Sequence, residues 1–171
     1  MESVFGYISE KARTKFKEIG PFEPEGFNDQ SATLEESDLI EENETYYQGQ
    51  IESKSDSKHG FGMQALADKS LYEGFFKANK KHGKGRLILY DGEVIEGEWK
   101  VGKLKGAGKY TLPDGSIYEG DWKDDLQHGN GKETLPNGDV YEGSYAHGMK
   151  NGHFKYEMAD GSVFRGEFED N

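Results

Sequence analysis

A repeated unit of 23 residues constrains this chain more than any other feature. Residues 118–122 (Tyr-Glu-Gly-Asp-Trp), 128–131 (His-Gly-Asn-Gly) and 137–138 (Asn-Gly) form a frame that recurs 23 residues earlier and 23 residues later. Copies start at positions 47, 72, 95, 118, 141 and 164, the last being a half-copy. A fixed period of this length indicates a repeat array, in which each unit is stabilised by its neighbours, rather than an ordinary globular core.

Each copy predicts a β-hairpin. In the second copy, Tyr72, Gly74 and Phe76 alternate with Glu73 and Phe75, which is the two-residue period of a strand. Residues 78–82 then turn the chain, and residues 83–89 return as the second strand. Asp-Gly and Asn-Gly pairs predict type I′ turns into the next copy, at positions 91–92, 114–115, 137–138 and 160–161. The turn inside each hairpin carries residue types that tolerate a left-handed backbone, namely Asn79, Gly102, Asp125 and Gly148.

The regularly placed glycines require a physical cause, because glycine weakens the interior of an ordinary strand. We expect an aromatic ring of one strand to lie over the backbone of its neighbour, where only glycine leaves enough room. The Tyr-x-Gly-x-Trp and Gly-x-Gly elements are then two halves of one packing arrangement.

The first 20 residues predict an amphipathic helix. Apolar residues recur at spacings of 3, 4, 4 and 3 on one helical stripe, which Gly20 and Pro21 end. The stripe consists of Phe5, Ile8, Ala12, Phe16 and Ile19. Either it packs on the first repeat and caps the array, or Phe5, Ile8, Phe16 and Ile19 dock on another protein. A membrane-surface helix is the less favoured alternative, because two glutamates lie among the basic residues.

Residues 21–45 predict an acidic linker or extended arm. They carry nine acidic groups and no basic one, and few of them could bury enough apolar surface to offset chain entropy. The candidate anchors of this arm on a surface are Phe22, Phe27, Leu34, Leu39 and Ile40.

Charge and composition argue against several classes of function. The repeats, residues 46–171, carry 17 basic and 21 acidic groups, whereas nucleic acids and anionic membranes require a basic footprint. We therefore expect no nucleic-acid partner, and membrane contact is not favoured despite a local basic patch between Lys77 and Arg86. The chain has no cysteine and no apolar run of the roughly 18 residues needed to span a bilayer. These features favour a cytoplasmic or organelle-matrix location.

The repeats resemble the MORN repeat (membrane occupation and recognition nexus), whose pattern is Tyr-x-Gly-x-Trp/Phe-x-x-Gly-x-x-x-Gly-x-Gly over 23 residues. The third copy carries this pattern at Gly97, Trp99, Gly102, Gly106 and Gly108, and the resemblance extends over residues 46–171. It implies a mainly β fold, a single-layer twisted antiparallel sheet of stacked β-hairpins with an aromatic-lined concave face, here preceded by one short α-helix. In MORN proteins that face can hold a helix or extended peptide of a partner.

Three copies depart from the pattern. The first has Ile51 at the second aromatic position, a longer turn over residues 53–58 and Asp-Lys at 68–69, so we expect its hairpin to be adapted to meet the N-terminal arm. The fifth has Phe154 in place of a glycine, which should change the shape of the groove there. The half-copy ends at residues 167–170 (Glu-Phe-Glu-Asp), a charged edge that discourages end-to-end pairing.

No residue pattern indicates catalysis, a cofactor or a metal site. His59, His82 and His128 share one repeat position, but equivalent residues of successive hairpins lie two strands, about 9–10 Å, apart. One zinc ion requires its nitrogen ligands at about 2.0–2.1 Å, so we expect these histidines to shape the turn instead. The Gly-x-Gly pairs lack the Lys-Ser/Thr of a phosphate loop, and the sequence has neither a Gly-x-Ser-x-Gly elbow nor a cysteine nucleophile. We therefore predict a non-enzymatic protein.

The leading hypothesis is an adaptor or scaffold subunit that holds a segment of another protein on the concave aromatic face, since Trp and Tyr are typical interface anchors. The predicted partner-binding residues are Tyr72, Phe76, Trp99, Tyr118, Trp122, Tyr141, Tyr145, Phe164 and Phe168. By analogy with small proteins built only of MORN repeats, we expect a ciliary axoneme, a radial-spoke head or another cytoskeletal assembly. The alternatives are a phosphoinositide or membrane-surface module, and self-assembly into dimers or filaments through the ends of the array.

Overall fold

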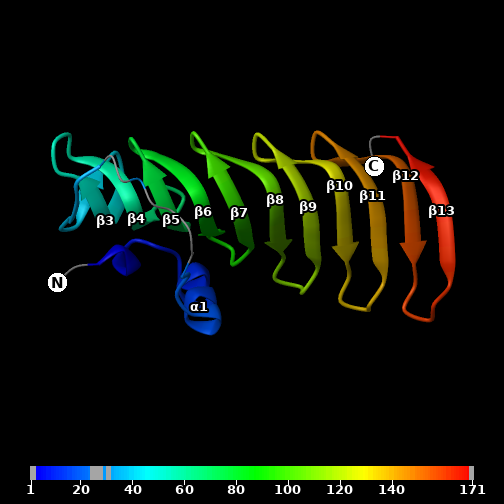
Figure 1. Ribbon diagram of the computed structural model, residues 1–171. Coiled ribbons are helices and arrows are strands. Elements are labelled where there is room, and N and C mark those ends of the chain that lie inside the picture. The colour runs from blue at the N-terminus through cyan, green and yellow to red at the C-terminus, as the bar shows by residue number, and fades with distance from the viewer. Residues whose placement is uncertain (1–2, 24–28, 30–31, 170–171) are drawn as a thin grey trace.

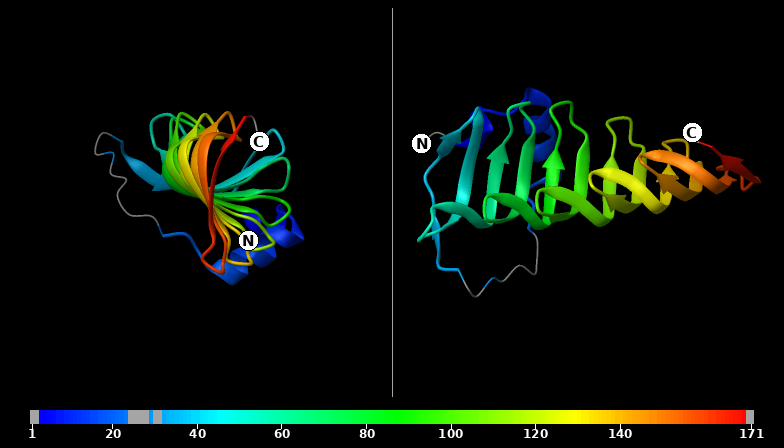
Figure 2. Two further views of the ribbon diagram at one scale, coloured as in Figure 1. Left: turned by 90° about the vertical axis from the view of Figure 1, so that its right-hand side faces the viewer. Right: turned by 90° about the horizontal axis from the view of Figure 1, so that it is seen from above.

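The computed structural model describes residues 3–23, 29 and 32–169, and it consists of one open antiparallel sheet with a short N-terminal helix (Figure 1). From β3 to β13 each strand pairs with its neighbours in sequence. The hairpins are β3 (Thr45–Glu52) with β4 (Ser57–Ala65), β5 (Leu71–Lys77) with β6 (Lys80–Ile88), β7 (Val94–Lys100) with β8 (Lys103–Thr111), β9 (Ile117–Lys123) with β10 (Leu126–Thr134), and β11 (Val140–Ala146) with β12 (Met149–Glu157), followed by β13 (Val163–Phe168). The predicted fold class is confirmed, and the strands rotate steadily along the array, as twisted sheets do (Figure 2).

Two kinds of turn join the strands. Inside the second hairpin, Ala78 and Asn79 have φ of 47° and 65°, which is the two-residue type I′ geometry, and the predicted left-handed residues are confirmed in the later hairpins as well. Between hairpins the predicted type I′ turn is wrong. At residues 89–92 only Gly92 has positive φ, and its N–H donates to the carbonyl of Leu89 at 3.0 Å, which closes a type I turn. The third and fourth copies place Pro113 and Pro136 at the second position of this turn, where the fixed φ of proline suits type I.

Aromatic rings lie over the glycine backbone, as the repeat predicts. A Cβ atom on Gly85 would come within 2.4 Å of the Tyr72 hydroxyl, and one on Gly131 within 2.4 Å of the Tyr118 ring. The Tyr72 hydroxyl also donates to the Phe75 carbonyl at 3.1 Å, inside the bulge where the register of β5 and β6 shifts. The same arrangement recurs at Tyr47 and Tyr118, whereas Leu104 lies at Gly97 in the third hairpin and Phe154 at Gly143 in the fifth. The resulting core consists of Tyr47, Tyr72, Phe76, Trp99, Leu104, Tyr118, Trp122, Tyr145 and Phe154.

The N-terminal segment packs on the sheet as a second, smaller core. Its helix α1 (Glu10–Ile19) starts later than the apolar stripe predicts, because the Ser9 hydroxyl accepts the Ala12 N–H at 3.0 Å and donates to the Tyr90 carbonyl at 2.6 Å. Before it, Val4–Gly6 form a short 3-10 turn. Of the predicted docking residues, Ile8 is buried, Phe5 and Phe16 are half-buried, and Ile19 is 39% exposed. The buried members of this core are Val4, Ile8, Ala12, Ala65, Leu71, Ile88 and Val94.

The acidic arm adds two strands to one edge of the sheet where it is described. β1 (Leu34–Glu36) and β2 (Ile40–Glu42) both pair antiparallel with β3, at opposite ends of that strand. Among the predicted anchors, Leu39 packs against the N-terminal core and Ile40 against the aromatic core, while Phe27 lies outside the described residues. The arm therefore covers the edge of the first hairpin, as the departures in the first copy suggest.

Gly120 and Gly166 offer a matched test of ring-over-glycine packing. They hold the same repeat position, but a Cβ on Gly120 would lie 2.5 Å from the Tyr118 hydroxyl, whereas nothing lies within 4 Å of one on Gly166. We expect Gly120→Ala to lower the free energy of unfolding by about 1–3 kcal/mol through overpacking, and Gly166→Ala to change it by about 0.5 kcal/mol at most. Urea unfolding followed by circular dichroism measures both, and equal effects of the two substitutions would contradict this packing.

The buried tyrosines predict a loss of stability at alkaline pH. Burial raises the pKa of Tyr118 to about 12 from its ordinary value of 10.0. The contribution of its neutral ring is fully present below pH 10.0 and is lost as pH rises through about 12. Tyr118→Phe should therefore flatten the fall in unfolding free energy between these pH values, measured by urea titrations. Tyr90→Phe, at a ring that is 55% exposed, provides the control, and an equal change of slope in the two variants would contradict the effect of burial.

Candidate protein-interaction face

The sheet has two faces of different character. Alternation along each strand turns Tyr72, Gly74 and Phe76 to one side, here called the ring face, and Glu73 and Phe75 to the other, here called the charged face. The ring face therefore presents aromatic rings and glycine backbone, whereas the charged face presents polar side chains over most repeats.

The predicted partner-binding rings lie on the ring face, and most of them are not available to a partner in this structure. Tyr72, Phe76, Trp99, Tyr118, Trp122 and Tyr145 are buried, Tyr141 and Phe168 are half-buried, and Phe164 is 57% exposed. The buried rings contact one another edge to face, for example Tyr72 and Trp99 with centroids 5.2 Å apart. The ring face is therefore the core of the array, and partner binding by these residues stays a prediction.

The fifth hairpin explains the greater exposure of Tyr141. Phe154 occupies the glycine position and is buried, with its ring 2.5 Å from where a Cβ on Gly143 would lie. The Tyr141 ring stacks instead on Tyr156, with centroids 4.4 Å apart, and Lys150 lies over it at 4.4 Å. The predicted change of shape at this copy is thus a displaced tyrosine.

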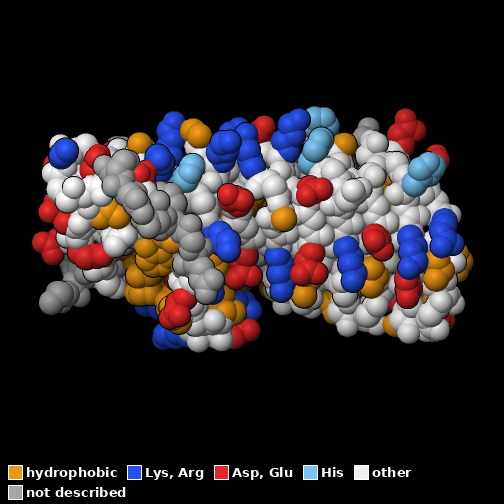
Figure 3. All heavy atoms as spheres, viewed as in Figure 1, with side chains coloured by type: hydrophobic (Ala, Val, Ile, Leu, Met, Phe, Trp, Pro, Cys, Tyr) orange, Lys and Arg blue, Asp and Glu red, His pale blue; other side chains and the backbone are white. Residues whose placement is uncertain are grey.

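Acidic and basic side chains alternate in one row across the charged face. Each member of the row is the register partner of the next, as opposite charges on neighbouring strands favour. The row consists of Glu73, Arg86, Glu96, Lys109, Glu119, Lys132, Glu142 and Lys155. The alternation is visible across this side of the molecule in Figure 3. These residues were not among the predicted site residues, although the glutamate that precedes the first glycine in the second to fifth copies is a visible signal in the sequence.

The first pair of the row is covered by the chain itself. Arg86 Nε and Nη2 donate to Glu73 Oε2 at 3.0 and 2.6 Å, and both side chains are buried. Arg86 Nη2 also donates to the Gly20 carbonyl at 2.5 Å, while Glu73 Oε1 accepts the Phe22 N–H at 3.3 Å. Burial raises the pKa of Glu73, and Arg86 acts against that rise. One acid-base pair thus binds a backbone donor and a backbone acceptor of the N-terminal segment.

Further contacts hold the covering segment on the face. The Arg86 guanidinium lies over the rings of Phe22 and Phe16, at 5.5 and 6.0 Å from their centroids. At the other end of the strands, Asp29 Oδ2 pairs with Lys77 Nζ at 2.8 Å and with His59 Nε2 at 3.3 Å. Gly20, Phe22 and Asp29 therefore contact the charged face over β4 to β6.

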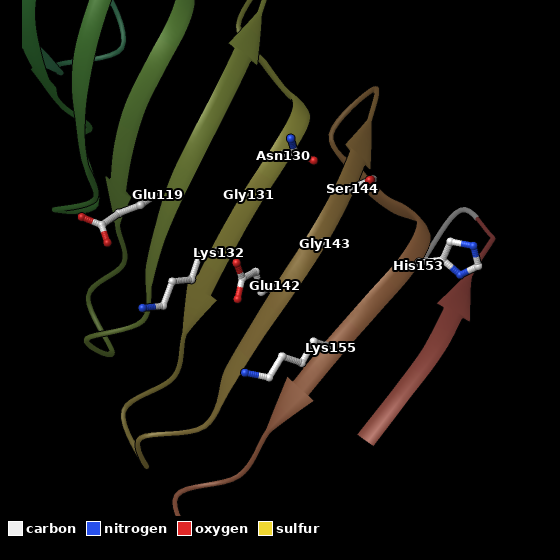
Figure 4. A pocket seen from close by; sticks show the side chains of 9 residues that line it. All are labelled: Glu119, Asn130, Gly131, Lys132, Glu142, Gly143, Ser144, His153 and Lys155. Atoms are coloured by element: carbon white, nitrogen blue, oxygen red, sulfur yellow. The ribbon is translucent and has the colours of Figure 1, made fainter. Parts of the chain in front are cut away.

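Beyond Phe22 the described residues leave the charged face open. A hollow of about 620 Å³ starts at Phe22 and extends over Glu96, Lys109 and Glu119. A second hollow, of about 590 Å³, follows over β9 to β12 and is lined by Lys132, Glu142 and Lys155, among other residues (Figure 4). In the described part of the chain, no ion pair joins Glu96 to Lys109, Glu119 to Lys132 or Glu142 to Lys155. Lys155 Nζ pairs instead with Glu157 Oε2 on its own strand, at 2.5 Å. The carboxylates of the row can accept hydrogen bonds from a ligand, and its lysines can donate hydrogen bonds to one.

Two other kinds of site find no candidate residues in the structure. Among residues 3–23, 29 and 32–169, no group of three or more His, Cys, Asp or Glu side chains is placed to hold a metal ion. His59 is engaged by Asp29, and the rings of His128 and His147 contact each other at 6.1 Å. Within the same described ranges, no helix combines the length and the apolar character needed to cross a lipid bilayer.

Comparison with known families agrees with the repeat structure. The model of the MORN repeat family matches residues 72–94, 96–117, 118–140 and 141–163, which is more than half of the chain. The chain belongs to the MORN-repeat family. MORN repeats are non-enzymatic modules of protein interaction or membrane association. The first hairpin of this MORN protein lies outside the match, in line with its altered turn and its pairing with the N-terminal arm.

Solved structures include a distant likeness to this MORN array. The TCP domain of SAS-4 (dCPAP) of Drosophila melanogaster, in complex with a proline-rich motif of Ana2 (dSTIL), has a TM-score of 0.47 and 12% sequence identity. The likeness covers 74% of this chain and 68% of that one, and at this level it carries no inference about partners. None of the curated proteins searched matches the chain.

The covered and open parts of the charged row should respond differently to substitution. Arg86→Ala leaves the buried Glu73 carboxylate without its partner, and we expect a loss of about 3–5 kcal/mol in unfolding free energy. Lys132 occupies the same repeat position but is exposed, so Lys132→Ala should cost about 0.5 kcal/mol or less. Thermal or urea unfolding measures both variants, and a Lys132→Ala effect as large as that of Arg86→Ala would contradict the difference in burial.

Proposed function

We propose that this protein is a non-enzymatic adaptor that binds a segment of another protein on the open part of its charged face, over β7 to β12. The occupied part of the same face carries the proposal. There the chain's own N-terminal segment is held by hydrogen bonds from side chains of the face to its backbone at Gly20 and Phe22. The open part repeats the same pair of charges on the same register.

The ring face is less suited to this role. The rings that would anchor a partner are already packed over glycine, and Tyr72 and Tyr118 are almost fully buried. A partner segment that displaced them would expose the backbone that they cover. We therefore keep the protein partner predicted from the sequence, but we place its binding site on the charged face and not on the ring face.

The cellular setting follows from the resemblance stated above. We propose that the partner is a subunit of a cytoskeletal assembly, in a ciliary axoneme or a radial spoke, and that the protein is cytoplasmic. What supports this is the analogy with small proteins built of MORN repeats. Fluorescence microscopy of the tagged full-length chain in ciliated cells of its source tests the location, and a uniform distribution that avoids the axoneme would contradict it.

Affinity capture with matched variants tests the function. Tagged full-length protein is compared with Glu119→Ala/Lys132→Ala on the open charged face and with Lys105→Ala/Asp124→Ala, which removes the exposed ion pair of 3.1 Å near the turns. We expect stoichiometric protein partners with the wild type and with the turn variant, and a loss of about tenfold with the charged-face variant. Mass spectrometry identifies and quantifies the partners.

The outcomes of this capture experiment separate the two function classes. Partners retained equally by both variants would contradict the proposed face. If no partner is captured, and if phosphoinositide-containing vesicles sediment the protein in a salt-sensitive manner, the adaptor function itself would be wrong and a membrane-surface module would replace it.

A further inference from the structure

The contact between the N-terminal segment and β5–β6 is an internal example of how the charged face holds a peptide. Glu73 accepts a hydrogen bond from the backbone N–H of Phe22, and Arg86 donates one to the backbone carbonyl of Gly20, two residues earlier. The aromatic side chain of Phe22 lies against the guanidinium of Arg86. Recognition at this pair is therefore directed mostly at backbone groups, with one apolar side chain, that of Phe22, lying on the pair.

Three further pairs of opposite charge follow along the row, and in the described part of the chain no segment covers them. They are Glu96 with Lys109, Glu119 with Lys132, and Glu142 with Lys155, each joined by strand register. Glu119, Lys132 and Glu142 are exposed, and the other three are half-buried. The hollow over the first of these pairs begins at Phe22, so the surface continues directly from the covering segment.

We propose that the open charged face binds an extended, polyproline-type peptide segment that presents an aromatic residue at every third position, with one Gly-Pro-Phe-like unit on each acid-base pair. This inference rests on the proposed function and specifies the chemistry of the partner. Gly20-Pro21-Phe22 of the chain itself makes these backbone contacts with the first pair, where Gly20 ends α1 with a φ of 75° and is therefore outside the polyproline II conformation. The partner supplies the extended units on the later pairs.

The spacing of the repeats selects this conformation. Equivalent pairs are two strands apart, which at 4.7–4.9 Å per strand is about 9.4–9.8 Å. A polyproline II helix has three residues per turn and rises about 3.1 Å per residue, so residues i and i+3 lie on one side about 9.3 Å apart. In a polyproline II segment that runs across the strands, every third residue therefore lies over an acid-base pair. Its backbone N–H and C=O groups are free for the side chains of the face, because polyproline II makes no internal hydrogen bonds.

The charge of the row agrees with such a peptide. The alternating glutamates and lysines give the open face no dominant sign, so a strongly basic or strongly acidic segment gains no net attraction. A peptide of low net charge, recognised through its backbone and its aromatic side chains, fits this surface best.

Synthetic peptides test the three-residue period on the full-length protein. The probe is a fluorescein-labelled peptide of three Gly-Pro-Phe units, and the control peptide has three Gly-Pro-Phe-Gly units, whose four-residue period does not match the pairs. Fluorescence anisotropy should give an affinity about tenfold higher for the three-residue period. Glu119→Ala/Lys132→Ala should weaken binding of the probe by about fivefold or more, whereas the control variant Lys105→Ala/Asp124→Ala should change it by less than about twofold.

Two results would overturn the inference. One is equal binding of both peptides, and the other is binding of the probe that does not depend on Glu119 and Lys132. Tighter binding of a helical peptide with a seven-residue apolar period than of the probe would also contradict the inference, and it would indicate that the partner segment is a helix. If the captured cellular partner depends on the charged face but the Gly-Pro-Phe probe fails to bind, the adaptor function stands and the proposed peptide chemistry is wrong.

Discussion

The array depends on side chains that lie over the glycine backbone of neighbouring strands. In the first, second and fourth hairpins that side chain is a tyrosine ring, whereas Leu104 and Trp122 fill the space in the third hairpin and Phe154 fills it in the fifth. A single-layer sheet has no second layer to cover its backbone. Here the rings of Tyr47, Tyr72 and Tyr118 cover it, and these rings are fully or almost fully buried. Each hydroxyl also donates to a carbonyl three residues later in its own strand, at the bulge where the register shifts. Gly-x-Gly is therefore required by the ring, and the array builds its core without an opposite layer.

Because of this packing, the two faces of the sheet have different roles. The ring face stabilises the fold, so the other face is free to carry polar side chains at every hairpin. The cross-strand row from Glu73 to Lys155 uses that freedom. Its first pair is buried beneath the N-terminal segment, while the later pairs are open. One surface thus combines an intramolecular contact with the proposed intermolecular one, and the two share the same backbone-directed chemistry.

Sequence periodicity predicted the hairpins and the glycine positions, because both are enforced locally by strand alternation and ring size. It misplaced the start of α1, since the cap at Ser9 depends on a carbonyl of the distant Tyr90. It also assigned type I′ geometry to the wrong turns, because Asp-Gly suits more than one turn type. The charged row could not be read directly, because the pairing of Glu119 with Lys132 and the covering of Arg86 by Phe22 are set by register and by long-range packing.

Site-specific photo-crosslinking in cells distinguishes a partner on the charged face from a partner on the ring face. A genetically encoded benzophenone amino acid replaces either Ser144, an exposed residue that lines the second hollow of the charged face, or Phe164, an exposed aromatic residue of the ring face. We expect a covalent adduct with the partner from position 144 and none from position 164. An adduct from position 164 alone would place the partner on the aromatic side and contradict the division of the two faces.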